Sequence, residues 1–273
     1  MTSGDAVTTW GIGDYPAMAE RLSGAAELVV ERAEVTSADR VLDVACGTGN
    51  AALLAARRGA SVVGVDFEPA LLAIARDRPG ADALEIDWRQ DDAVALGLPD
   101  AAFTAVVSVF GVMYAADQQG TAQELARCCS PGGRLVLAAW TPGGFMPAMG
   151  GVLAPYLPPP PVGGGPPSRW GEKEALAELL EPHGLSLRRA SRHSLPLAFA
   201  DRREAVDFLV RTAGHVRSEQ HDLERSGRWT NVLSDLDRLV AEHDEGGEDG
   251  VLLSLEYLLA VAVKPAAATA PAA

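Results

Sequence analysis

The residues best suited to chemistry lie in a short, glycine-containing stretch near the start of the chain. Residues Arg40–Val44 are predicted to form a buried strand, which Gly47 and Gly49 then break. An alanine- and leucine-rich helix is predicted to follow at once, over 51–56. A strand, a glycine turn and a helix in this order point several backbone N–H groups at one spot beyond the strand's carboxyl end. Glycine is needed because a side chain would collide with a ligand there or forbid a positive φ.

An acid inside this strand narrows the choice of ligand. The spacing Gly47-x-Gly49-x-x-Ala52 also fits the turn that binds dinucleotides, but Asp43 lies four positions before the first glycine. This carboxylate would repel a pyrophosphate and attract a ligand that carries an ammonium or sulfonium group. S-adenosylmethionine (SAM) carries both cations, and the stretch resembles motif I of the class I SAM-dependent methyltransferases. If no ligand binds here, the stretch is a tight turn around an aspartate whose hydrogen bonds are all made within the chain.

A second acid, Asp66, ends the predicted strand over 61–66. An acid at the tip of the second strand of a βαβ unit can accept hydrogen bonds from both ribose hydroxyls of a nucleotide. The adjacent Phe67 offers an aromatic face to the adenine. These two residues predict a nucleoside-binding end for the site.

The segment after the predicted third strand also resembles the family. Its run from Asp92-Ala93 to Phe103 matches the family segment in which the aspartate accepts from the adenine amino group and the alanine backbone contacts the ring. Asp92 fits that position better than Asp91, although a slip by one residue stays open. Thr104 departs from the family pattern, which has an aspartate there, and we expect this loss to be tolerated at a strand-capping position.

The remaining cofactor contacts follow from the same resemblance. In the family an N-terminal helix covers the cofactor, so Tyr15 either touches the methionine end of SAM or packs beneath the helix that begins at Asp14. Ser108 lies near the end of the predicted fourth strand, and Met113 is placed to line the cofactor's sulfur. The predicted cofactor-binding set is Tyr15, Asp43, Ala45, Gly47, Gly49, Asp66, Phe67, Asp92, Ala93, Ser108 and Met113.

The elements that must position these residues alternate between strand and helix. This order predicts an α/β fold: a doubly wound, seven-stranded, mostly parallel, Rossmann-like methyltransferase sheet whose last strand is antiparallel. We expect four regions: a SAM-binding core with its N-terminal helix at 1–140, a lid segment at 141–171, the rest of the sheet with a helical substrate cap at 172–264, and a disordered tail at 265–273. In the last of the ordered regions, helices are predicted over 172–183, 202–213 and 220–243.

The lid segment is crowded with proline and glycine, including Pro158–Pro161 and Gly163–Gly165. A loop of this length is either a functional lid or disordered. Its apolar side chains favour a lid over a hydrophobic acceptor. The predicted substrate-binding residues are Tyr114, Trp140, Phe145, Met146, Tyr156 and Trp170.

Methyl transfer from a sulfonium needs alignment and exclusion of water rather than a catalytic triad, a metal or a covalent nucleophile. A hydroxyl acceptor also needs a general base. The histidines are His183, His193, His215, His221 and His243, and for each of them a surface or structural role is the commoner outcome. We rank His215, in the predicted cap, first as the catalytic base, with Tyr114 as the other candidate.

The composition limits the partners. A net charge of −14 argues against nucleic acid, which requires a basic surface. No apolar run is long enough to span a bilayer, and the N-terminus lacks the features of a signal peptide, so we expect a cytoplasmic protein without a membrane partner. The spacing of the three cysteines fits neither a disulfide framework nor a metal site. A homodimer stays open.

These observations predict a SAM-dependent methyltransferase that releases S-adenosylhomocysteine (SAH). The stretches Trp140–Phe145 and Trp170-Gly171 resemble a bacterial branch that acts on small molecules, so we expect a hydrophobic natural product as acceptor. O-methylation is favoured over C- or N-methylation. The alternatives are a SAM-fold protein that catalyses another reaction or serves as a partner subunit, and an NAD(P)-dependent oxidoreductase. An RNA or protein methyltransferase is disfavoured by the charge and by the absence of its Asn/Asp-Pro-Pro-aromatic motif.

Overall fold

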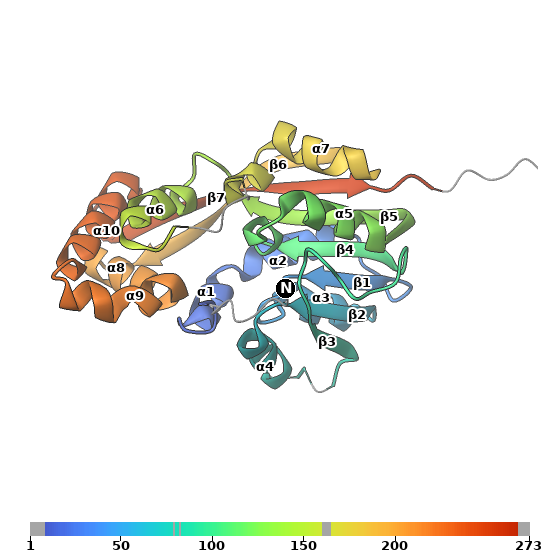
Figure 1. Cartoon of the computed structure of the whole chain (residues 1–273), viewed down its shortest axis with the longest axis horizontal. Helices are drawn as coiled ribbons and strands as arrows, with labels where there is room; N and C mark the ends of the chain where they lie inside the picture. The colour runs from blue at the N-terminus through green and yellow to red at the C-terminus, as the bar shows by residue number, and fades with distance from the viewer. Residues whose placement is uncertain (1–8, 79, 82, 160–164, 267–273) are drawn as a thin grey trace, which may run out of the picture. The chain divides into compact units, whose positions relative to one another are not determined.

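A computed structural model of the chain describes residues 9–78, 80–81, 83–159 and 165–266 (Figure 1). The chain divides into two compact units, and each is described by itself. The helical unit consists of Met1–Leu22, Gly143–Pro160 and Ser194–Leu255. The sheet unit consists of Ser23–Pro142, Pro161–His193 and Glu256–Ala273.

The fold is built around a seven-stranded sheet with the strand order β3-β2-β1-β4-β5-β7-β6. Four neighbouring pairs, from β3 to β5, are parallel, and β7 runs antiparallel to β5. The predicted fold class is therefore confirmed. The strands are β1 (Arg40–Val44), β2 (Ser61–Asp66), β3 (Ile86–Gln90), β4 (Phe103–Val109), β5 (Cys129–Trp140), β6 (Ser186–Phe199) and β7 (Val251–Val263).

The central strands β1 and β4 are apolar and almost wholly buried, as expected for a parallel sheet covered by helices. The helices of the sheet unit are α2 (Ser23–Arg32), α3 (Asn50–Arg57), α4 (Pro69–Asp77), α5 (Gln118–Cys128) and α7 (Lys173–Leu180), with 3-10 turns η1 (Val112–Tyr114), η3 (Pro167–Gly171) and η4 (Glu181–His183).

The helical unit has its core where α10 packs against α6 and α8. Val232, Leu236 and Val240 of α10 are fully buried there, at the spacing of one helix face. The helices of this unit are α1 (Tyr15–Arg21), α6 (Phe145–Leu153), α8 (Arg202–Thr212), α9 (Gly214–Arg225) and α10 (Trp229–His243), with 3-10 turns η2 (Ala154–Tyr156) and η5 (Gly247–Asp249).

Several elements differ from the prediction. The N-terminal helix is interrupted at Leu22, and the helix predicted over 220–243 is two helices joined at 226–228. The segment 141–171, expected as an irregular lid, contains α6 and is shared between the two units. Most of the predicted proline rod and glycine hinge, and most of the predicted disordered tail, lie outside the described residues. Within the described ranges, none of the helices has the length and apolar character needed to cross a membrane.

Candidate active site

The glycine turn after β1 has the conformation that the sequence predicts. Ala45, Gly47 and Gly49 have φ angles of 53°, 55° and 81°, so three of five consecutive residues are left-handed. Gly49 is the N-cap of α3 and offers no side chain to cap it. The first N–H groups of the helix therefore face the carboxyl edge of the sheet without a side-chain cap from Gly49, as in other ligand-binding turns of this kind.

Two buried acids hold this turn. Oδ2 of Asp43 accepts a hydrogen bond from the N–H of Ala52 at 2.9 Å, which fixes α3 to β1. Oδ2 of Asp66 accepts from the N–H of Gly47 at 2.6 Å, and Oδ1 accepts from the N–H of Glu68 at 2.9 Å. Asp66 thus joins the glycine turn to the turn after β2, and the two predicted acids belong to one hydrogen-bonded site.

The electrostatics of these acids suit a cationic ligand. Burial raises the pKa of Asp43 to about 7, and the nearby charge of Asp66 acts in the same direction. Burial also raises the pKa of Asp66. A third acid, Glu68, is buried, and its Oε2 has no hydrogen-bond partner among the described residues. A ligand with positive charge and hydroxyl groups would stabilise the ionised carboxylates and supply donors, and SAM has both.

On the nucleoside side, Phe67 follows Asp66 directly and is 45% exposed. Asp92 is also exposed, and its Oδ1 accepts from the N–H of Val94. Asp91, the alternative to Asp92, uses both carboxylate oxygens within the chain, on the N–H groups of Gly97 (2.6 Å) and Asp92 (3.0 Å). Asp92 is therefore the better placed of the two for contact with a ligand.

Ser108 and Met113 lie inside the sheet unit. The Ser108 hydroxyl is fully buried, donates to the carbonyl of Val44 at 2.8 Å and accepts from the N–H of Val112. Met113 is 1% exposed. Both side chains join β4 and the turn after it to the core, so the described contacts give them a positioning role at this edge.

A second conformational constraint, which the sequence does not reveal, lies at the end of β4. Phe110 has a φ of 58°, which is unusual for a bulky residue, and its ring stacks on Trp140 with centroids 3.6 Å apart. A Cβ atom on Gly111 would lie 2.5 Å from the Cβ of Ala45, so the turns after β1 and β4 touch. No local sequence signal reveals this conformation, because it depends on the contact between neighbouring strands.

Tyr114, a candidate base and substrate contact, is 42% exposed. Burial of its hydroxyl raises its pKa to about 12, partly offset by a hydrogen bond with the Trp140 side chain. The phenol is therefore neutral near pH 7 and unsuited to accept a proton. Trp140 and Trp170 are buried, and Nε1 of Trp170 has no partner among the described residues.

In the helical unit, Tyr15 and His215 come from two segments that touch. A Cβ atom on Gly13 would lie 2.8 Å from the carbonyl oxygen of Thr212 and 2.9 Å from the nitrogen of Gly214. The N–H of Asp14 donates to the carbonyl of Arg211 at 2.9 Å. The start of α1 is thus fixed to the start of α9, where His215 is half-buried, and burial lowers the pKa of His215.

Three predicted substrate residues also belong to the helical unit. Phe145 is buried against the ring of His243, whereas Met146 is half-buried. The Tyr156 hydroxyl donates to Oδ2 of Asp235 on α10, at 2.5 Å. This bond ties η2 to α10, so the described contact of Tyr156 is internal to the unit.

The other histidines have contacts of their own. His183 faces Gln119 at 3.4 Å, and His193 lies 2.8 Å from the Ser191 hydroxyl. Nδ1 of His243 donates to the carbonyl of Leu239, and His221 is exposed.

The sequence is similar to known proteins over most of its length. Residues 42–137 match the family described as methyltransferase domain. The uncharacterized protein Rv1405c of Mycobacterium tuberculosis is 34% identical over 258 residues, 93% of this chain and 92% of that protein. A second protein of that organism, Rv1403c, is 39% identical, and the match covers 66% of each chain. The demethylmenaquinone methyltransferase of Thermus thermophilus is 45% identical over 120 residues, 43% of this chain and 53% of that enzyme.

Solved structures share the fold at low identity. The YcgJ protein of Bacillus subtilis superposes with a TM-score of 0.65 and 17% identity, over 89% of this chain and 99% of that one. Geranyl diphosphate methyltransferase in complex with SAM gives a TM-score of 0.54 and 18% identity, over 89% and 85%. With the full-length relative, the matching domain and the acid-lined glycine turn together, the chain belongs to the class I SAM-dependent methyltransferases and uses SAM as its methyl donor.

Proposed function

We propose that the enzyme methylates a small, hydrophobic acceptor, and that the methyl group goes to an oxygen atom. The observation that carries this proposal is the position of two exposed aromatic side chains. Phe67 directly follows β2, and Tyr114 lies in η1, shortly after β4. They are the large apolar side chains that the sheet unit exposes among its described residues. Apolar surface at the ligand-binding edge of an α/β sheet indicates apolar ligands that cover it. The adenine of SAM would cover Phe67, which leaves Tyr114 for a hydrophobic acceptor.

The chain's own contribution is binding and orientation. When bound, SAM supplies a methyl group already activated by the sulfonium. Asp43 would face the cationic part of SAM across the glycine turn, and Asp66 would accept from the ribose hydroxyls. Asp92 and Ala93 would receive the adenine. Holding the donor and the acceptor in line can supply most of the rate enhancement.

We propose His215 as the general base for a hydroxyl acceptor. Its lowered pKa keeps the imidazole neutral near pH 7, so Nδ1 or Nε2 can take the acceptor's proton. Tyr15, on the segment fixed to the start of α9, would cover the methionine end of SAM. Tyr114 would serve as an aromatic wall rather than as a base, because its phenol stays protonated.

The other predicted substrate residues act in two ways in this proposal. Trp140 and Trp170 are buried in the sheet unit and Phe145 is buried in the helical unit, so each would act through the packing of its own unit rather than by direct contact with the acceptor. Met146 would contact the acceptor directly, and Tyr156 would hold η2 in place through Asp235.

A relative supports a small acceptor. The demethylmenaquinone methyltransferase that matches 43% of the chain is named for a small-molecule acceptor, demethylmenaquinone. The net charge of −14 supports the exclusion of nucleic acid. A natural product as acceptor, the cytoplasmic location and a homodimer remain predictions.

The test is a screen of phenols, hydroquinones, carboxylic acids and amines with SAM that carries a carbon-13 methyl group. SAH formation reports turnover, and the carbon-13 chemical shift of the product identifies an O-, C- or N-methyl group. An O-methyl product from an apolar hydroxyl compound is expected. Turnover only with amines, proteins or RNA would overturn the proposal.

A further inference from the structure

An irregular segment, residues 91–98, carries the proposed adenine contacts. It follows β3 and contains neither helix nor strand, so its backbone has no ladder or helix bonds to fix it. Asp92 and Ala93 can select adenine only if this backbone is held in one position. The structure shows what holds it.

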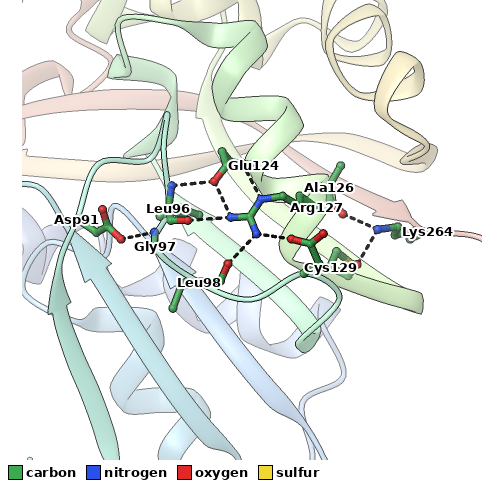
Figure 2. A network of polar contacts seen from close by, with 10 residues as sticks. Asp91, Leu96, Gly97, Leu98, Glu124, Ala126, Arg127, Cys129 and Lys264 are labelled. Carbon is green, nitrogen blue, oxygen red and sulfur yellow. Dashed lines mark hydrogen bonds and ion pairs between the residues drawn. The ribbon is translucent and has the colours of Figure 1, made fainter.

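Two side chains of α5 bind this segment (Figure 2). The N–H of Leu96 donates to Oε2 of Glu124 at 2.7 Å. Nη2 of Arg127 donates to the carbonyl of Leu96 at 2.8 Å, and Nη1 donates to the carbonyl of Leu98 at 2.6 Å. One helix therefore satisfies three backbone groups that the segment leaves without partners of its own.

The Arg127 guanidinium is itself held in place. Nε donates to Oε1 of Glu124 at 2.8 Å and Nη2 donates to Oε2 at 2.7 Å, which is the two-point geometry of a strong pair. Nη1 also donates to Oδ1 of Asp100. At the end of α5, Nζ of Lys264 donates to the carbonyls of Ala126 and Cys129. The helix end, the arginine and the segment thus form one connected network.

The network reaches the proposed adenine contact through Asp91. Gly97, between the two residues held by Arg127, donates its N–H to Oδ2 of Asp91, whose Oδ1 accepts from the N–H of Asp92. The N–H of Asp91 donates to the carbonyl of Asp66, the proposed ribose acid. The Asp92 backbone is therefore linked to Arg127 by three hydrogen-bonded steps: from Arg127 to the carbonyls of Leu96 and Leu98, from Gly97 to Asp91, and from Asp92 to Asp91.

We propose that Arg127 and Glu124 are positioning residues that set the enzyme's selectivity for adenine, an inference that rests on the proposed role of Asp92 and Ala93. The readout is the affinity for two ligands: SAH, and its analogue with hypoxanthine in place of adenine, which lacks the 6-amino group. The wild-type enzyme should prefer SAH. Arg127→Gln should weaken SAH binding by about tenfold and the analogue by much less, so the preference shrinks.

Arg134→Gln is the matched control. Arg134 is equally anchored in the sheet unit, with bonds to the carbonyls of Ala33 and Thr104 and an ion pair with Asp39. It lies in the middle of β5, opposite Ala105 near the amino end of β4, and none of its described contacts reaches the segment 91–98. This variant should keep the preference for SAH. Glu124→Gln, a milder change, should speed hydrogen exchange at the Leu96 N–H without unfolding the enzyme.

The outcomes separate the two proposals. If Asp92→Ala removes the preference for SAH but Arg127→Gln keeps it, the positioning role is overturned while the adenine site stands. If the wild-type enzyme shows no preference, the adenine assignment itself fails. Equal losses for both ligands in Arg127→Gln, or slow exchange at Leu96 in Glu124→Gln, would also overturn the positioning role.

Discussion

The indole ring of Trp88 lies directly on Gly49. A Cβ atom at this position would overlap Cη2 of Trp88, and one on Gly64 would lie 2.6 Å from Cε3 and Cζ3. The third strand therefore presses a large side chain against both the glycine turn and the second strand. Glycine is required at position 49 for two reasons: its φ of 81° is left-handed, and the Trp88 ring leaves no space for a Cβ atom.

We expect Gly49→Ala to destabilise the fold by about 2–4 kcal/mol, the sum of left-handed strain and overpacking. Trp88→Leu should make room for the methyl group and restore part of this loss, because the strain in φ would remain. Urea unfolding of the two single variants and the double variant measures the coupling. Additive effects would contradict a direct contact.

Asp66→Asn and Asp66→Ala should weaken SAM binding to different extents. Asparagine can still accept from the N–H of Gly47, whereas alanine cannot. Loss of the charged acceptor should cost about 1.5–3 kcal/mol of binding free energy in both variants, with a further loss in the alanine variant as the turn loosens. Calorimetric titration with SAM gives the values. Unchanged affinity in both variants would remove Asp66 from the site.

The variant Asp43→Asn should bind SAM at least tenfold more weakly than the wild-type enzyme. Its free energy of unfolding should nevertheless be higher than that of the wild type at about pH 8. The pKa of Asp43 is raised to about 7, so between roughly pH 4 and 7 the folded chain keeps a proton that the unfolded chain has released. Its contribution to stability therefore falls as the pH rises through this window, by up to about 1.4 kcal/mol per pH unit. The free energy of unfolding of the asparagine variant should not show this decrease with rising pH.

Urea unfolding at about pH 5 and pH 8 tests the Asp43 prediction, with the exposed Asp87→Asn on β3 as the control. In the wild-type enzyme, SAM affinity should rise between about pH 6 and pH 8, as the ionised Asp43 attracts the cation. A pH-independent affinity would contradict this role.

His215→Ala should lower turnover by a factor of about 10²–10⁴ at saturating SAM and leave the SAM affinity unchanged. His221→Ala, on the exposed part of the same helix, is the control and should keep full turnover. Tyr114→Phe should also keep turnover, because a phenol with a pKa of about 12 does not act as the base. A normal rate in His215→Ala would exclude this histidine.

The sequence predicts local features with strong chemical signals and misses those that depend on packing. Helix α4 begins at Pro69 and η4 ends before the left-handed Gly184, so these two boundaries follow from proline and glycine positions. Residues 130–133 have the composition of a tight turn, but they form an irregularity within β5, because Cys129 pairs with Phe103 before Arg134 pairs with Ala105. No local pattern indicates this long-range pairing.

The same contrast holds in the site. The glycine turn and its two acids could be found from their spacing. The left-handed Phe110 and the contact of Trp88 with Gly49 could not, because they depend on neighbouring strands. Glu124 and Arg127 have the spacing of a helical ion pair, but their bonds to the segment 91–98 appear only in the fold.

The division of the helical unit into three separate stretches has a consequence for biosynthesis. Helix α1 leaves the ribosome some 180 residues before its partner α8. The nascent chain can form the parallel strands β1 to β5 before α8 is available to pack against α1. No single truncation separates the two units. A fragment that ends after Trp140 would keep the glycine turn but would leave helix α1 without its partner α8.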